Sequence, residues 1–144
     1  MWPFLGWLVL AALSIWVCFE DITKRKISNN ICLSVLFMSG MLSVVSGVFP
    51  DLLPTMLILF FGFVLTRLNI IAAGDIKLMA AFSIAIKPEF LTFTFLVIIF
   101  IGGLIGVLYL VMKLLYGDRY IKNEGVPFGV PISVGSLLGI AASL

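Results

Sequence analysis

The side chains available for chemistry in this sequence are few, and their types exclude several reaction classes. The chain contains no histidine, so a Ser/His/Asp triad, a Cys/His pair and an HExxH zinc site are all excluded. A Ser/Lys pair remains, with Ser28 and Lys26 as its candidates near a loop, but only their closeness in sequence favours it. Carboxylates are therefore the main candidates for acid–base chemistry.

Three carboxylates lie at the boundaries of long apolar runs. Glu20 and Asp21 end the first run, and Asp75 begins the fourth. An ionisable side chain at a membrane boundary is costly unless it faces water or the protein interior, which makes it a functional candidate. Two carboxylates held together share one proton and titrate as a pair. The structural alternative is that Asp75 is a charge favoured at a helix N-terminus and that Asp21 pairs with Lys24 or Arg25.

The elements that position these acids are predicted to be membrane helices. Of the 144 residues, 62% are hydrophobic and 11% are charged, whereas soluble domains are about 45–50% apolar. We expect an all-α, polytopic membrane bundle that forms one integral membrane domain over residues 1–144, since no linker or low-complexity tract divides it. The net charge of +2 is small and scattered, which argues against a nucleic-acid partner. Cys18 and Cys32 form no CxxC pair, so neither a metal site nor a disulfide is indicated.

Six apolar runs are predicted to form helices, and a helix that crosses the hydrocarbon layer needs about 20 apolar residues. The runs cover residues of about 2–20, 31–49, 52–72, 75–87, 90–116 and 127–144. The fourth run is short for a span and by itself also fits a re-entrant or interfacial segment. Pro50, Asp51 and Pro54 indicate a tight turn, and residues 87–89 indicate another.

The basic residues predict the orientation of these helices. If all six runs cross, eight of the nine basic residues lie on one side and only Lys87 lies opposite. By the positive-inside rule the basic side is cytoplasmic. A re-entrant fourth run would split the basic residues between the two sides, so six crossing helices are favoured. We therefore expect a multi-pass protein of the cytoplasmic (inner) membrane, in contact with lipid, with both termini on the non-cytoplasmic side and the three acids on the cytoplasmic side.

Three motifs fall on that predicted cytoplasmic side. Asp21 precedes the stretch KISN at residues 26–29, AAGDIKL covers residues 72–78, and VPFGVP covers residues 126–131. In this order they resemble the type IV prepilin peptidase family of GxGD aspartic membrane proteases. Members of that family carry a first aspartate five residues before a basic-Ile-Pro-Asn stretch, a second in GxGDxK, and a proline- and glycine-rich start of the final span.

The sequence departs from the family pattern at two positions and lacks one segment. Ala72 stands in place of the first glycine of GxGD, and Ser28 stands in place of the usual proline. Larger bacterial members have a cysteine-containing insertion between their first helices and also N-methylate the product. Here the first loop is predicted to have about ten residues, far short of a folded domain. The chain is therefore similar to the short, peptidase-only type found with Flp or tight-adherence pilus systems, or to archaeal preflagellin peptidases, and we expect no methyltransferase activity.

The resemblance implies a function and a set of site residues. It implies an aspartic endopeptidase that removes the leader peptide of type IV prepilin-like proteins at the cytoplasmic face of the membrane. The resemblance further implies that the cut is made at a cytoplasm-facing glycine that precedes a hydrophobic helix of the substrate. Asp21 and Asp75 would be the catalytic pair, with no metal and no cofactor. The residues implied around the substrate or beside the pair are Gly74, Lys77, Lys26, Asn29, Pro127 and Gly129.

Two functions of other classes remain open from the residues alone. Intramembrane acids also mark ion pathways, so a small ion-coupled transporter or channel subunit could bind a cation at Asp21 and Asp75. A non-catalytic assembly factor of a pilus or secretion system would carry the same acids only as helix-end charges. A prepilin-cleavage assay beside an ion-flux assay separates these readings. The sequence itself indicates no oligomeric state.

Overall fold

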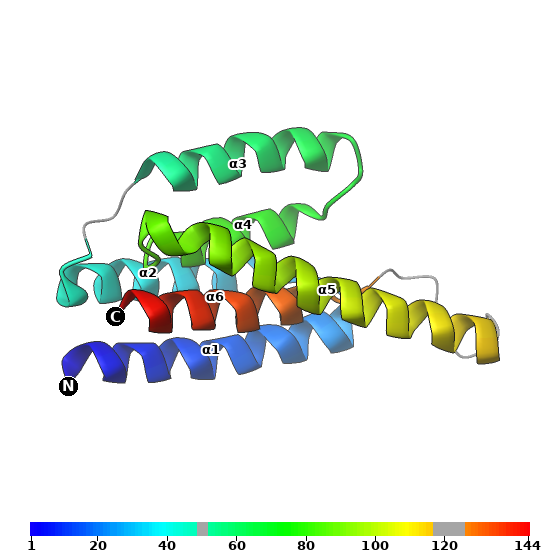
Figure 1. Ribbon diagram of the computed structural model, residues 1–144, viewed down its shortest axis with the longest axis horizontal. Coiled ribbons are helices and arrows are strands. Elements are labelled where there is room, and N and C mark those ends of the chain that lie inside the picture. Colours follow the sequence, from blue (N-terminus) through cyan, green and yellow to red (C-terminus); the bar gives the residue numbers. More distant parts are fainter. Residues whose placement is uncertain (49–51, 117–125) are drawn as a thin grey trace.

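Within the residues that the structure describes, the chain folds into six helices that follow one another along the sequence. The computed structural model describes residues 1–48, 52–116 and 126–144 (Figure 1). The helices are α1 (Trp2–Lys24), α2 (Asn29–Ser46), α3 (Leu52–Arg67), α4 (Ala73–Ser83), α5 (Pro88–Tyr116) and α6 (Gly129–Ser143). No strand occurs in these described ranges. The predicted all-α class with six helices is confirmed.

The loop between α1 and α2 is shorter than the predicted ten residues. It covers only residues 25–28, because α1 continues to Lys24 and α2 begins at Asn29. Arg25 ends α1 in the left-handed conformation, with φ 53° and ψ 27°. Ser28 is extended and caps α2 by accepting a hydrogen bond from the Ile31 N–H. The serine that replaces the family's proline is therefore the N-cap of α2.

Two further predicted boundaries are wrong. The third helix ends at Arg67 instead of about residue 72, because Asn69 turns into the left-handed region at φ 56° and breaks the helical hydrogen-bond pattern. Pro54 lies within the first turn of α3 and not in a turn, since proline is tolerated where a helix N–H has no intrahelical partner. The other residues of that predicted turn, Pro50 and Asp51, lie outside the described residues.

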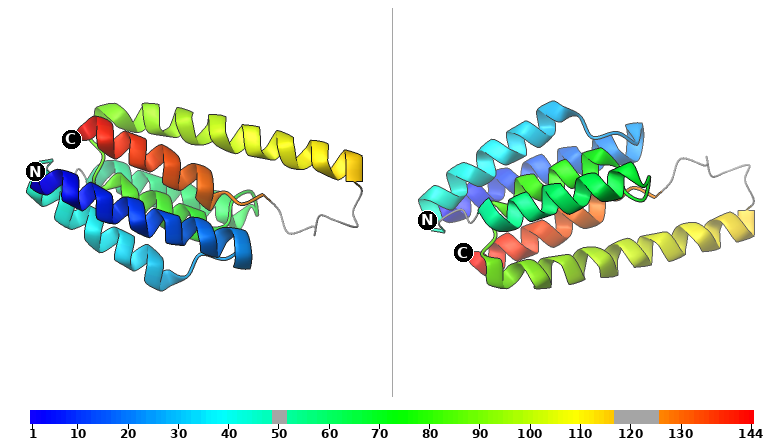
Figure 2. Two further views of the ribbon diagram at one scale, coloured as in Figure 1. Left: turned by 90° about the horizontal axis from the view of Figure 1, so that it is seen from below. Right: turned by 90° about the horizontal axis from the view of Figure 1, so that it is seen from above.

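Four helices form the centre of the bundle, and two lie outside it. Helices α1, α2, α4 and α6 pack in a closed ring in which α1 contacts α2 and α6, and α4 contacts both α2 and α6. Outside the ring, α3 packs on α4 and α5 packs on α6. Consecutive helices run in opposite directions, so both chain ends lie at one end of the bundle (Figures 1 and 2). The other end of the bundle contains the ends of α1 and α3 and the starts of α2, α4 and α6. Asp21, near the end of α1, and Asp75, near the start of α4, therefore lie at this end.

The shortest helix, α4, is the most enclosed. Its 11 residues are about 16 Å long at 1.5 Å per residue, well short of the roughly 30 Å of a bilayer core. Leu78 and Phe82 are fully buried, and the helix is held on three sides by α2, α3 and α6. Protein thus surrounds most of α4, which explains how a helix shorter than a bilayer core is accommodated in the bundle.

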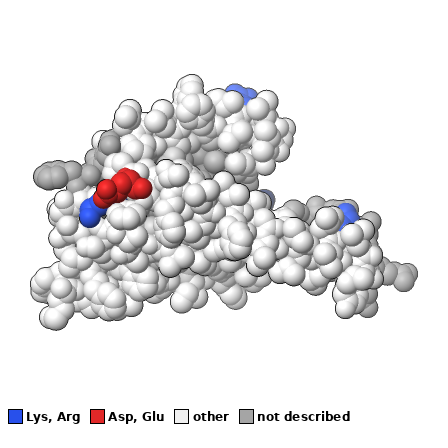
Figure 3. Space-filling model, in the orientation of Figure 1, with Lys and Arg blue, Asp and Glu red and all other residues white. Residues whose placement is uncertain are grey.

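Helices α1, α2 and α5 are long and apolar enough to cross a membrane by length and composition. Their outward faces carry large exposed hydrophobic side chains, for example Trp16 at 63%, Phe37 at 65% and Phe100 at 72% exposure. The face shown in Figure 3 is almost entirely uncharged, with charge in a few small spots. An apolar surface of this extent is expected in contact with lipid and not with water.

Candidate active site

Asp21 is buried near the end of α1 and contacts the start of α6. Its side chain is only 6% exposed. Asp21 Oδ2 accepts a hydrogen bond of 2.7 Å from the backbone N–H of Gly129, which is the first residue of α6. The first N–H groups of a helix have no partner within it. The carboxylate satisfies one of them and lies where the helix dipole favours negative charge.

The contact between α1 and α6 requires a very small residue at position 129. A Cβ atom added at Gly129 would lie 2.8 Å from Asp21 Oδ2 and 3.0 Å from Asp21 Cγ, whereas carbon atoms in favourable contact are about 3.5–4.0 Å apart. The backbone of Gly129 is not in the left-handed region. Close approach to the carboxylate, and not backbone conformation, therefore explains the glycine.

Asp75 lies in the first turn of α4 and is partly exposed. Ala72 precedes the helix in an extended conformation with φ −70° and ψ 142°, and its carbonyl accepts a hydrogen bond of 3.1 Å from the Asp75 N–H. No side chain caps this helix, and an acidic residue in a first turn interacts favourably with the helix dipole. Each of the two aspartates thus lies beside a different helix N-terminus.

The two aspartates line one cavity of about 880 Å³. Arg25 and Lys26 from the first loop complete the charged part of the wall. The remainder is mostly apolar and includes Ile70, Phe95, Ile98, Phe128 and Ile132. A cavity that is largely apolar with a few polar groups at one place is typical of a site that binds a ligand and orients it.

A side-chain hydrogen bond holds the start of α4 beside the start of α2. Lys77 Nζ donates to Asn29 Oδ1 at 2.9 Å, although the two residues are far apart in the sequence. Lys77 follows Asp75 by two positions on α4, so the bond restrains the same turn that carries this carboxylate. Both residues are exposed and lie outside the cavity wall.

A comparison with known protein families matches residues 8–107, well over half of the sequence, to the type IV leader peptidase family. The chain belongs to this family. The matched stretch contains Asp21 and Asp75 and ends before Gly129. No curated protein and no solved structure matches the chain. Family membership indicates a protease with a leader peptidase role, and together with the three long apolar helices it indicates a membrane protein.

In this leader peptidase, the residues expected around the pair fall into three groups. Gly74 and Lys26 line the cavity together with the two aspartates. Gly129 is bonded to Asp21, and Lys77 and Asn29 are bonded to each other. Pro127 is not part of the cavity wall, which is formed on either side of it by Val126 and Phe128.

The surroundings of Gly74 leave room beside the backbone. A Cβ atom at this position would lie 3.6 Å from Ile27 Cβ, which is an ordinary van der Waals distance. The protein's own packing therefore does not require a glycine at position 74. Gly74 also lines the cavity, where the lack of a side chain leaves its backbone uncovered by any side chain of its own.

Sequence reasoning missed a contact between Arg25 and Tyr109 of α5. The Arg25 guanidinium donates to the Tyr109 hydroxyl, and its Cζ lies 5.3 Å from the centre of the tyrosine ring. Arg25 lines the cavity, so this contact joins the loop at the cavity wall to the outer helix. In the sequence, Arg25 is explained by membrane orientation alone, and Tyr109 lies within the long apolar run of residues 90–116 with no signal that pairs the two.

Glu20 and the two thiols are not part of the cavity wall. Glu20 forms an ion pair of 2.9 Å with Lys24 and accepts a hydrogen bond of 3.2 Å from the Ser28 N–H. Its carboxylate therefore braces the first loop and does not line the cavity. Cys18 and Cys32 are free thiols outside the cavity wall. Within the described ranges, no group of three or more His, Cys, Asp or Glu side chains could hold a metal ion.

Proposed function

We propose that this chain is an aspartic endopeptidase in which Asp21 and Asp75 remove the leader peptide of a type IV prepilin-like protein. The observation that carries the proposal is that two carboxylates from α1 and α4, distant in sequence, line a single cavity. Membership of the type IV leader peptidase family supports the same reaction class. We propose, beyond family membership, the aspartic mechanism, the prepilin-like substrate and the roles of Asp21 and Asp75.

In the proposed mechanism the pair shares one proton, and each carboxylate has a different role. Asp21 is the ionised member, because the Gly129 N–H and the N-terminus of α6 stabilise its negative charge. It takes a proton from a water molecule whose oxygen attacks the scissile carbonyl carbon. Asp75 is the protonated member, and its proton goes to the carbonyl oxygen as the tetrahedral intermediate forms. Collapse of the intermediate breaks the C–N bond, and the proton held by Asp21 passes to the leaving amine. One hydroxyl of the intermediate returns its proton to Asp75 as the C=O bond re-forms, so the pair again shares one proton.

The substrate is proposed to reach the pair as an extended peptide at the membrane boundary. Ala72 and Gly74 line the cavity, and a glycine, which has no side chain, allows another chain to approach its backbone closely. A helical segment hides its peptide groups in its own hydrogen bonds, so the leader must unwind around the scissile bond. Arg25 and Lys26 line the same cavity, and we propose that they contact the peptide near its carbonyl groups.

The proposed location is the cytoplasmic side of the inner membrane, in a multi-pass topology. Basic residues gather at the end of the bundle that holds the aspartates, namely Lys24, Arg25, Lys26, Arg67 and Lys77. Lys87, between α4 and α5, lies at the opposite end with the two termini. The positive-inside rule then places the cavity toward the cytoplasm and both termini away from it.

No methyltransferase activity is part of the proposal. The loop between α1 and α2 contains only residues 25–28, and its contacts to Glu20 and Tyr109 hold it against the bundle. Four residues do not form a second binding site for a methyl donor between these helices.

The test is to replace each aspartate by asparagine and to measure cleavage of a co-expressed prepilin. Asp21→Asn and Asp75→Asn are each expected to abolish processing, while the protein still inserts into the membrane at the normal level. Glu20→Gln is the control, because Glu20 is a neighbouring acid that lies outside the cavity, and it is expected to retain most of the activity. Undiminished cleavage by either asparagine variant would remove that residue from the pair.

A further inference from the structure

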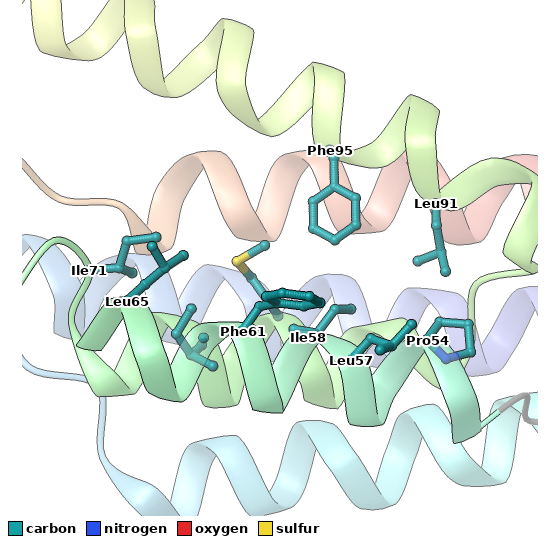
Figure 4. A pocket seen from close by; sticks show the side chains of 11 residues that line it. Pro54, Leu57, Ile58, Phe61, Leu65, Ile71, Leu91 and Phe95 are labelled. Atoms are coloured by element: carbon teal, nitrogen blue, oxygen red, sulfur yellow. The ribbon is translucent and has the colours of Figure 1, made fainter. Parts of the chain in front are cut away.

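A second cavity lies at the side of the bundle, between α3 and α5 and against α4. Its volume is about 350 Å³, and its wall side chains are apolar. Leu57, Phe61 and Leu65 come from α3, whereas Leu91 and Phe95 reach toward them from α5 (Figure 4). We call this cavity the apolar groove. Because α3 packs on α4 and α5 packs on α6, the groove lies between the two outer helices and is closed on its inner side by Ile76 and Met79 of α4.

The apolar groove adjoins the cavity that holds the aspartates. Ile71, Met79 and Phe95 line both, so the two spaces share one wall. Met79 follows Asp75 by four residues on α4, which is about one helical turn. A chain that leaves the carboxylates along these shared residues reaches the groove about one turn of α4 from Asp75.

The dimensions of the groove fit one face of a helix. Along α3 the groove extends from Pro54 to Leu65, a rise of about 16 Å. A helix is about 10–12 Å across, so a volume of 350 Å³ holds less than one full helical turn. The groove therefore has room for a row of apolar side chains projecting from a helix that lies along it, and not for the helix itself.

We propose that the apolar groove binds the hydrophobic segment of the substrate that follows the scissile bond. This inference rests on the proposed leader peptidase function, in which a peptide bond is held at Asp21 and Asp75. The residues after that bond must leave the cavity, and the groove is an apolar path that begins at its wall. In a membrane, apolar residues on that path replace lipid at the surfaces of α3 and α5, and their close packing favours association.

The position of the groove also predicts which part of the substrate it binds. Its length of about 16 Å corresponds to about three helical turns. The first three turns of the hydrophobic segment are therefore expected to contact α3 and α5, with one stripe of side chains at i, i+3 and i+4 spacing facing the protein. The opposite stripe would face lipid.

Phe61 and Phe60 provide a matched pair of positions for the test. Both are lipid-accessible phenylalanines on α3, at 60% and 66% exposure, but only Phe61 lines the groove. A photo-crosslinking amino acid is introduced at position 61 or 60 in an Asp75→Asn background, with a full-length prepilin co-expressed. We expect crosslinks from position 61 to the first three turns of the prepilin's hydrophobic segment, and at least tenfold fewer from position 60.

A kinetic comparison tests the same groove without a crosslinker. Phe61→Trp narrows the groove, and its cleavage of the full-length prepilin is compared with its cleavage of a synthetic peptide that stops shortly after the scissile bond. We expect kcat/KM for the full-length substrate to fall about tenfold, mainly through KM, because a misfitted apolar contact changes discrimination by this order. Cleavage of the short peptide is expected to stay within twofold, and Phe60→Trp should leave both substrates within twofold.

The outcomes separate failure of the groove from failure of the proposed function. Equal losses for both substrates, no loss for either, or crosslinks from position 61 only to lipid or to a second copy of this chain would overturn the groove assignment. The proposed function is tested separately by wild-type processing of the same prepilin. Crosslinking to the hydrophobic segment with no wild-type cleavage would leave the groove as a binding site and reject the peptidase mechanism.

Discussion

The backbone N–H of Gly129 donates a 2.7 Å hydrogen bond to Asp21 Oδ2, and this bond joins the end of α1 to the start of α6. It ties the position of one carboxylate to a helix that lies beyond the family-matched stretch of residues 8–107. The proposed first aspartate is thus held by the last helix of the chain.

Gly129→Ala is expected to reduce cleavage by at least tenfold. The new Cβ would lie 2.8 Å from Asp21 Oδ2, so either the carboxylate moves or α6 shifts, and displacements of about 1 Å at a catalytic group can cost about 100-fold. Gly103→Ala is the control, because a Cβ there meets nothing within 4 Å. The measurement is kcat/KM for prepilin cleavage with membrane-protein yield as a check on folding. Equal activity in the two alanine variants would show that the Asp21–Gly129 contact has no role in the reaction.

The Lys77–Asn29 hydrogen bond is expected to act as a positioning pair for Asp75. Asn29→Ala and Lys77→Met should each lower kcat several-fold with little change in KM. The double variant should be no worse than the worse single variant, because the two changes remove the same contact. Asn30→Ala, at the adjacent exposed position, should be close to wild type. Additive losses in the double variant would contradict a shared role.

Removing the Tyr109 hydroxyl tests the contact between the first loop and α5. Tyr109→Phe keeps the ring beneath the Arg25 guanidinium but removes the acceptor of its hydrogen bond. We expect a loss of about twofold to fivefold in kcat/KM, in line with about 1 kcal/mol for one hydrogen bond. Tyr116→Phe, on the same helix and exposed, should have no effect. Equal kcat/KM values for the two variants would show that the Arg25–Tyr109 hydrogen bond does not influence the reaction.

The proposed carboxylate pair predicts a bell-shaped dependence of kcat/KM on pH. At low pH both aspartates are protonated and no base remains, whereas at high pH both are ionised and no proton donor remains. Glu20→Gln should leave the shape of the profile unchanged, because Glu20 pairs with Lys24 outside the cavity. The profile is measured with a purified enzyme and a peptide substrate. A rate that rises with pH to a plateau would indicate a single base instead of a shared-proton pair.

Much of the fold followed from the apolar pattern of the sequence. The six helices are predictable because each apolar run is long enough to be recognised as a separate helix. The helix ends that carry Asp21 and Asp75 are predicted to lie together because the basic residues favour a single membrane orientation. The end of α3 is not predictable because Asn69 adopts a left-handed conformation. Asparagine tolerates this conformation better than most residues, but an asparagine in a sequence does not show that it is adopted. The first loop was overestimated because Arg25 and Ser28 are cap residues adjoining the helices and not spacers.

The details of the candidate site depend on contacts that no sequence spacing specifies. The Gly129–Asp21 hydrogen bond requires α6 to begin at a particular height beside α1. The role of Phe61 in the groove could not be distinguished from that of Phe60, because adjacent phenylalanines in an apolar run carry the same signal and only the rotation of α3 separates them. Lys77 and Asn29 were singled out by resemblance, but their pairing with each other was not predicted.

The length of α5 has a consequence for the lipid environment. Its 29 residues extend for about 43 Å, against a hydrocarbon core of about 30 Å, and hydrophobic mismatch of this size is relieved by tilting the helix or by thickening the surrounding bilayer. Phe95 and Ile98 of the same helix form part of the wall beside the aspartates. Acyl-chain length in a reconstituted vesicle should therefore alter the tilt of α5, and with it the shape of the space in which cleavage is proposed to occur.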